Sequence, residues 1–125
     1  MKKISTKNAP KAIGPYTQAM MTNNMLFVSG QIPFIPKTMV VSGNDIKSQT
    51  KQSILNVLAI VNEAGFDIEN IAKIGIFMKD MSMFTEMNEV YASFFSEHKP
   101  ARFAVEVARL PKDVLIEIDA IAIKE

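Results

Sequence analysis

The chain has 125 residues, a length that fits one compact domain over residues 1–125. Its basic and acidic residues nearly cancel, for a formal net charge of +1. This balance gives no electrostatic case for binding nucleic acid or an acidic membrane surface. The chain has no cysteine and one histidine, His98, which excludes disulfides, thiolate nucleophiles and multi-histidine zinc sites. A cysteine-free composition and the lack of an apolar export signal suit a cytoplasmic protein.

The N-terminal third of the sequence is predicted to form strands. A short strand over Lys2–Thr6 is followed by a loop that two prolines and a glycine interrupt. Two further strand-like runs, Tyr16–Thr22 and Met25–Ser29, flank Asn23-Asn24, and asparagine tolerates the positive φ angles of tight turns. We therefore predict a β-hairpin, followed by a loop or irregular hairpin over Pro36–Gly43.

The central part predicts a helix, a strand and a second helix. Apolar spacing indicates an amphipathic helix over Asn44–Ala64 that ends at Gly65. Ile71–Asp80 alternates between apolar and mixed positions, which predicts a strand. We expect Ser82 to cap a second helix that continues to about His98. The face of the strand that we expect to be apolar consists of Ala72, Ile74, Ile76 and Met78.

The C-terminal part predicts two strands, Arg102–Arg109 and Val114–Lys124, joined by a turn over Leu110–Asp113. If a two-residue loop sets their register, Arg102 pairs opposite Ile121. The set that we expect against the helices is Phe103, Val105, Val107, Val114, Ile116, Ile118 and Ala120. The opposite set is Arg102, Ala104, Glu106, Leu115, Glu117, Asp119, Ile121 and Ile123.

The order of elements is βββαβαββ, which predicts an α+β fold: a mixed β-sheet with two helices packed on one face. The other face of this sheet carries more aliphatic side chains than a face in contact with water usually does. We therefore expect this face to pack against copies of the same chain in a homo-oligomer.

Arg102 and Glu117 are the side chains best suited to chemistry. Arginine binds carboxylates through two parallel hydrogen bonds, and a lone glutamate can orient or deprotonate water. The alternative is an ion-pair network with Glu106 and Asp119 that fixes an oligomer interface. The hairpin register places Glu117 about 13 Å along the strand from the partner of Arg102. A bulge, a substrate between the two groups or a neighbouring subunit would have to connect them.

Three other polar residues permit two interpretations each. Asn88 lies in an apolar row of the second predicted helix, where a buried amide must satisfy a loop or contact a ligand. Tyr16 and Ser29 are either packing and turn residues or part of a site.

Several motifs follow one another in a fixed order over nearly the whole chain. They are Asn8-Ala9-Pro10, Ile13-Gly14-Pro15-Tyr16, Val28–Pro33, Val90-Tyr91, Phe94-Phe95, Pro100-Ala101-Arg102, Val105–Asp113 and Ile116-Glu117-Ile118. In this order they resemble the Rid, or YjgF-type, family of reactive-intermediate imine deaminases. The resemblance implies a chorismate-mutase-like fold, assembled as a homotrimer with active sites between subunits.

The resemblance also implies an activity: hydrolysis of 2-imino acids, such as 2-iminopropanoate and 2-iminobutanoate, to 2-oxo acids and ammonia without metal or cofactor. Carried onto this sequence, it implies that Arg102 grips the substrate carboxylate. Glu117, with a backbone group at Ala104, would hold the attacking water. The further substrate-binding residues that it implies are Tyr16, Ser29 and Gly30, with Asn88 from a neighbouring subunit.

The sequence departs from the family at two adjacent positions. Phe103 and Ala104 stand where the family usually has a small serine or threonine and then cysteine, and the loop before Pro100 is shorter. These departures are the best support for an alternative function, a non-catalytic trimer that binds a small carboxylate through Arg102. RNA cleavage, proposed for some relatives, is disfavoured by the near-neutral charge and the lack of a basic run.

Overall fold

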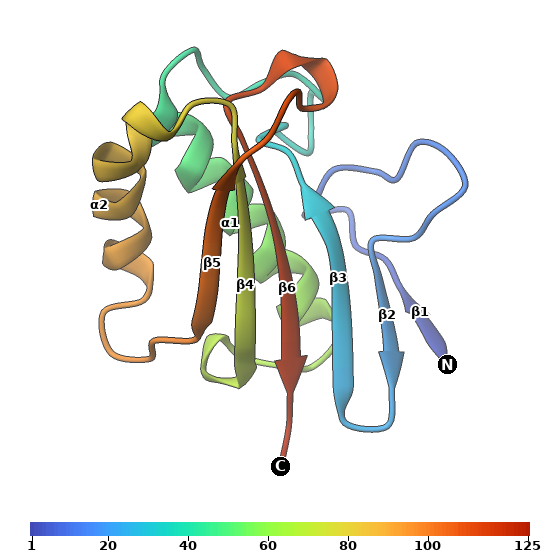
Figure 1. Cartoon of the computed structure of the whole chain (residues 1–125). Helices are drawn as coiled ribbons and strands as arrows, with labels where there is room; N and C mark the ends of the chain where they lie inside the picture. The colour runs from blue at the N-terminus through green and yellow to red at the C-terminus, as the bar shows by residue number, and fades with distance from the viewer.

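The structure is a computed structural model that describes residues 1–125. A six-stranded sheet has the strand order β1-β2-β3-β6-β4-β5, and both helices cover one of its faces (Figure 1). Neighbouring strands are antiparallel except for the parallel pair β4 and β5. The predicted α+β class and element order are confirmed. The elements are β1 (Lys2–Ile4), β2 (Ala19–Thr22), β3 (Met25–Gln31), α1 (Ile46–Glu63), β4 (Ile71–Met78), α2 (Phe84–Phe94), β5 (Ala101–Glu106) and β6 (Ile116–Ile123).

The predicted hairpin joins β2 and β3. Thr22 pairs with Met25, so Asn23 and Asn24 form a two-residue turn, and Asn23 adopts a φ of 50°. The segment after β3 is the expected irregular hairpin, in which one isolated bridge pairs Phe34 with Val41. Both features follow from local turn chemistry and are therefore readable from sequence.

Helix α1 holds the loop that follows β3. Asp45 caps its N-terminus by accepting a hydrogen bond from the Ser48 amide at 2.9 Å. The buried Asn56 side chain donates to the carbonyl oxygens of Ile32 and Phe34 at 3.2 and 2.9 Å. Because this amide lies in the core without access to water, its two bonds fix the loop against the helix.

Three expected local details are wrong. Asp80, not Ser82, accepts the capping bond, in a short 3-10 turn that precedes α2. Helix α2 ends at Phe94 rather than near His98. In β4 a bulge between Ile71 and Lys73 leaves Ala72 exposed and buries Ile71 instead.

The predicted pairing of the two C-terminal strands is wrong. Strand β4 lies between β5 and β6, so that Ile74 pairs with Arg102 on one side and Ala120 on the other. Residues opposite each other in a sheet point to the same face, and Ile74 and Ala120 are buried under the helices. Arg102 therefore points to the helix side at the sheet edge, and Phe103 points to the open side.

The faces of β5 are thus the reverse of those expected, whereas those of β6 are as expected. The physical reason lies in β4: Gly75 pairs with Phe103, and a Cβ at Gly75 would lie 2.7 Å from the Phe103 ring. The missing side chain leaves room for this ring, which also contacts Phe77 edge to face at a centroid distance of 5.4 Å.

The open face of the sheet carries large hydrophobic residues, as expected, but Phe103 and Val105 were expected on the helix side and are part of it instead. Phe27, Phe103 and Val105 are 42%, 37% and 41% exposed, although each is a large hydrophobic residue. The register places Phe27 beside Ile121, in the middle of this face. Such a face is typical of a surface that meets another protein. Neither α1 nor α2 combines the length and apolar character that crossing a membrane requires.

Candidate functional site

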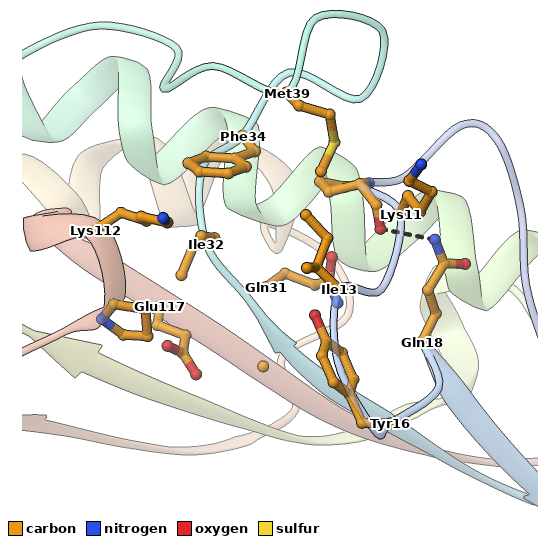
Figure 2. Close-up of a pocket in the computed structure, with 13 residues that line it drawn as sticks. Lys11, Ile13, Tyr16, Gln18, Gln31, Ile32, Phe34, Met39, Lys112 and Glu117 are labelled. Atoms are coloured by element: carbon orange, nitrogen blue, oxygen red, sulfur yellow. Dashed lines mark hydrogen bonds between the residues drawn. The ribbon is translucent and has the colours of Figure 1, made fainter.

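A cavity of about 440 Å³ lies at the C-terminal end of β3 and the N-terminal end of β6, where three loops converge. The loops precede β2, follow β3 and precede β6, and Figure 2 shows their side chains around the cavity. Part of its wall is apolar, formed by Ile13, Ile32, Phe34 and Met39, and its one carboxylate is that of Glu117. The lining residues are Pro10, Lys11, Ile13, Tyr16, Gln18, Gly30, Gln31, Ile32, Phe34, Met39, Pro111, Lys112 and Glu117.

Glu117 reaches the cavity across Gly30. The side chain of Glu117 lies so close to Gly30 that an added Cβ would overlap its Oε2 atom. A glycine at this position therefore leaves the space that the carboxylate occupies. Strand β6 supplies the glutamate and strand β3 the glycine, and a register shift between Val28 and Gln31 accompanies this contact.

The pKa of Glu117 is raised above its ordinary value. Partial burial is the main cause because it disfavours the charged form, and repulsion from the Asp119 carboxylate adds to it. Burial also raises the pKa of Asp119, although Lys73 and the Gly75 amide oppose this. A carboxyl group whose pKa is moved toward neutral pH suits proton transfer to and from water.

Replacing Gly30 with alanine is expected to push the Glu117 carboxylate toward solvent. Because burial is the main cause of its raised pKa, the pKa of Glu117 should fall toward the ordinary value. A pH titration of the Glu117 carboxyl carbon by NMR, in the wild type and in Gly30→Ala, measures this shift. An unchanged titration would show that the carboxylate does not depend on the space at Gly30.

Tyr16 and Ser29, both expected at the site, differ in their placement. Tyr16 lies at the cavity rim and is 54% exposed, and its hydroxyl points toward the cavity in Figure 2. The Ser29 hydroxyl instead donates to the Thr17 carbonyl oxygen at 2.6 Å, and Ser29 is not among the lining residues. Its visible role is to join β3 to the segment that carries Tyr16.

Gln18 anchors the loop that carries Tyr16. Its buried side-chain amide donates to the carbonyl oxygens of Thr6 and Pro10, at 3.1 and 2.8 Å, and accepts from the Thr6 amide at 2.7 Å. The bond to Pro10 is drawn in Figure 2. Because these bonds fix the base of the loop, the tip with Tyr16 is held over the cavity.

Arg102 belongs to a second cluster, at the edge of the sheet beside α2. Its Nη1 donates to Asn88 Oδ1 at 2.7 Å. Its guanidinium carbon lies 4.6 Å from the ring centroid of Tyr91 and 5.5 Å from that of Phe84. The resemblance implied that Asn88 reaches the site from a neighbouring subunit, but the Asn88 bound to Arg102 belongs to the same chain.

Arg102 and Glu117 are not brought together within one chain. Two strand spacings and three residues separate their positions in the sheet, about 14 Å. Arg102 also points to the helix side and Glu117 to the open side, so the expectation that they share a face is wrong. Ala104 lies on β5 with Arg102, two strands away from Glu117. Each chain thus carries two separate clusters of candidate site residues, one around Arg102 and one around Glu117.

Several cavity residues were not identified from sequence. Lys112 lines the cavity beside Glu117, and its backbone has a positive φ of 58°. Phe34 and Met39 form part of the apolar wall (Figure 2). The run Leu110–Asp113 indicated a turn, but a turn motif does not reveal the direction of its side chains. Phe84 and Tyr91 were expected only as core residues.

Comparison with known proteins shows similarity over the full chain. The family model described as endoribonuclease L-PSP matches residues 6–124. A RutC family protein of Pyrococcus horikoshii is 57% identical over 98% of this chain and 97% of its own. A 2-iminobutanoate/2-iminopropanoate deaminase of Escherichia coli K12 is 52% identical over 98% of each. The crystal structure of E. coli TdcF with bound serine has a TM-score of 0.96 and 46% identity, over 100% of both chains.

Proposed function

The chain belongs to the endoribonuclease L-PSP family, the family of YjgF and Rid proteins with the chorismate-mutase-like fold, and from this premise we propose that it hydrolyses 2-imino acids to 2-oxo acids and ammonia. A relative with this named activity is 52% identical over nearly the whole chain. The binding of serine by TdcF supports a ligand of amino-acid size. A cytoplasmic location fits the cysteine-free composition.

The observation that carries the proposal is the Glu117 carboxylate in its cavity. In the reaction, water adds to the carbon of the protonated imine and forms a C–O bond. Glu117 accepts one proton from this water and gives it to the nitrogen. The C–N bond then breaks as the hydroxyl oxygen forms the C=O bond of the 2-oxo acid, and the remaining hydroxyl proton passes through Glu117 to the departing ammonia. The raised pKa of Glu117 brings its proton affinity closer to that of the groups it serves. Arg102 would hold the substrate carboxylate during these steps.

The separation of Arg102 and Glu117 supports an active site between two copies of the chain. A small imino acid cannot span the roughly 14 Å between the two clusters of one chain. Contacts between different surfaces of successive copies form a closed ring when the rotation between copies closes. A ring in which the Arg102 cluster of one copy meets the Glu117 cluster of the next would complete the site. We propose a homotrimer of this kind, with the apolar open face buried inside.

Mixing two impaired variants tests the composite site. Arg102→Ala and Glu117→Gln each remove one of the two groups of the composite site, so each pure variant should hydrolyse freshly generated 2-iminobutanoate about tenfold or more slower than the wild type. In trimers refolded from an equal mixture, about one quarter of the composite sites should contain both intact residues. We therefore expect about one quarter of the wild-type activity to return. Semicarbazide trapping of the remaining imine measures it.

The outcome separates the possibilities. No recovery in mixed trimers, with an active wild type, would place both residues in one chain's site. An inactive wild type would favour the alternative, a trimer that binds a small carboxylate without converting it. Phe103, whose presence suggested that alternative, points to the opposite side of β5 from Arg102 and does not crowd it.

A further inference from the structure

We propose that Phe84, Asn88 and Tyr91 form a cradle on α2 that orients Arg102 for a planar carboxylate. The three residues are spaced i, i+4 and i+7, so they lie along one side of the helix. Each of them contacts the guanidinium group of Arg102. The identity of the carboxylate rests on the proposed function, whereas the orientation of Arg102 does not.

The cradle explains why an amide interrupts an apolar row. Asn88 stands between Phe84 and Tyr91, where packing alone would favour a hydrophobic residue. Its Oδ1 accepts from Arg102 Nη1 at 2.7 Å, and this is the one hydrogen bond that the guanidinium makes in the chain. Arg102 has no carboxylate partner: the salt bridges of the chain are Lys47–Glu89 and Arg109–Asp113. Its charge is therefore left for a ligand.

The position of the Asn88 bond determines which part of Arg102 stays free. A guanidinium binds a carboxylate through two parallel N–H bonds, and one such pair consists of Nε–H and Nη2–H. Asn88 occupies Nη1 and leaves this pair without a partner. The cradle thus holds Arg102 at Nη1 and leaves its Nε–H and Nη2–H groups free to bind a carboxylate.

Tyr91 supports Arg102 through its ring. The residue is 7% exposed, and its ring stacks on Phe95 at a centroid distance of 4.6 Å. The guanidinium carbon of Arg102 lies 4.6 Å from the centroid of the Tyr91 ring. The negative face of this ring attracts the cation. The Tyr91 hydroxyl is buried and has no hydrogen-bond partner. The ring, not the hydroxyl, therefore carries the positioning role.

Two substitutions at Tyr91 test whether its ring or its hydroxyl holds Arg102 in place. Tyr91→Phe keeps the ring, so Arg102 should remain as rigid as in the wild type. Tyr91→Leu removes the ring, and Arg102 should become mobile. NMR relaxation of the Arg102 Nε–H group reports this motion without any ligand, and Arg109, whose ion pair is exposed, serves as the internal reference in each spectrum.

Affinity for 2-oxobutanoate, measured by NMR titration, gives the second readout. We expect Tyr91→Phe to bind like the wild type and Tyr91→Leu to bind about fivefold more weakly, the loss of about 1 kcal/mol of cation–π attraction. Asn88→Ala should act in the same direction, and it replaces Tyr91→Leu in both readouts should that variant fail to fold.

Two results would overturn the cradle. One is an Arg102 side chain that stays rigid when the ring of Tyr91 or the amide of Asn88 is removed. The other is a loss in Tyr91→Phe as large as that in Tyr91→Leu, which would assign the role to the hydroxyl. Because neither readout involves hydrolysis, an inactive enzyme with a rigid, ring-dependent Arg102 would contradict the proposed function and leave the cradle standing.

Discussion

Glu117→Gln is expected to lower kcat for 2-iminobutanoate by about 10²–10⁴-fold, the usual contribution of a general acid–base group. Glutamine keeps the size and the position of the side chain over Gly30, but it cannot accept a proton from water. The rate of imine loss, corrected for spontaneous hydrolysis, measures the effect. Glu63→Gln, at an exposed position at the end of α1, is the matched control and should retain full activity.

The pH profile should identify Glu117 as the base. A carboxylate accepts protons only when ionised, and burial with repulsion from Asp119 raises its pKa. The activity of the wild type should therefore fall on the acid side at a higher pH than an ordinary glutamate would give. Asp119→Asn removes the repulsion between the two carboxylates, so the fall in activity at acid pH should move to lower pH. If the fall in activity at acid pH occurs at the same pH in Asp119→Asn as in the wild type, the titrating group is not Glu117.

The same pKa shift sets the expected effect of Glu117→Gln on stability. A carboxyl group with a raised folded-state pKa favours folding below its unfolded-state pKa, and this contribution is lost as the pH rises through the folded-state value. The ionised form of Glu117 is thus unfavourable for folding. Glu117→Gln should leave the free energy of unfolding unchanged or raise it, so a loss of activity cannot be attributed to unfolding.

Sequence reasoning succeeded where local rules decide the structure. The Asn23-Asn24 turn, the α1 helix up to Gly65 and the burial of Ile116, Ile118 and Ala120 all follow from turn chemistry or clear periodicity. These features depend on residues close together in the chain. The element order followed from them.

The pairing of β5 could not be predicted in this way. Arg102 and Glu117 were connected through an assumed hairpin because their strands are adjacent in sequence, but β4 lies between them. One face of β5 carries Phe103 and Val105, so periodicity alone predicts that this apolar face meets the helices. In the structure the apolar face lies on the open side of the sheet instead. The orientation of β5 is instead explained by Gly75 on the neighbouring strand β4, which has no side chain and leaves space for the Phe103 ring.

The candidate site shows the same limit. The resemblance implied roles for Glu117, Gly30 and Tyr16, and the structure places all three at one cavity. The role of Asn88 depends instead on Arg102, which is 14 residues away and reaches it only when β5 occupies the sheet edge. A contact of this kind becomes visible only after the strands are paired.

Arg102→Lys is expected to lose nearly as much activity as Arg102→Ala, although lysine keeps the positive charge. Lysine cannot form two parallel bonds to a carboxylate, and its ammonium group lacks the planar shape that fits the Tyr91 and Phe84 rings. A charged hydrogen-bond pair contributes about 1.5–3 kcal/mol, so kcat/KM should fall by about 10–100-fold. Steady-state kinetics with 2-iminobutanoate and 2-iminopropanoate measure the loss.

Arg109→Lys is the matched control for this change. Its ion pair with Asp113 is exposed, so the same exchange of arginine for lysine should alter kcat/KM by less than about twofold. If Arg102→Lys retains most of its activity while Arg102→Ala does not, a point charge is sufficient and two-pronged carboxylate binding is wrong. If neither variant loses activity, Arg102 is not part of the site, and the carboxylate must be bound elsewhere, with Lys112 beside Glu117 as the first position to examine.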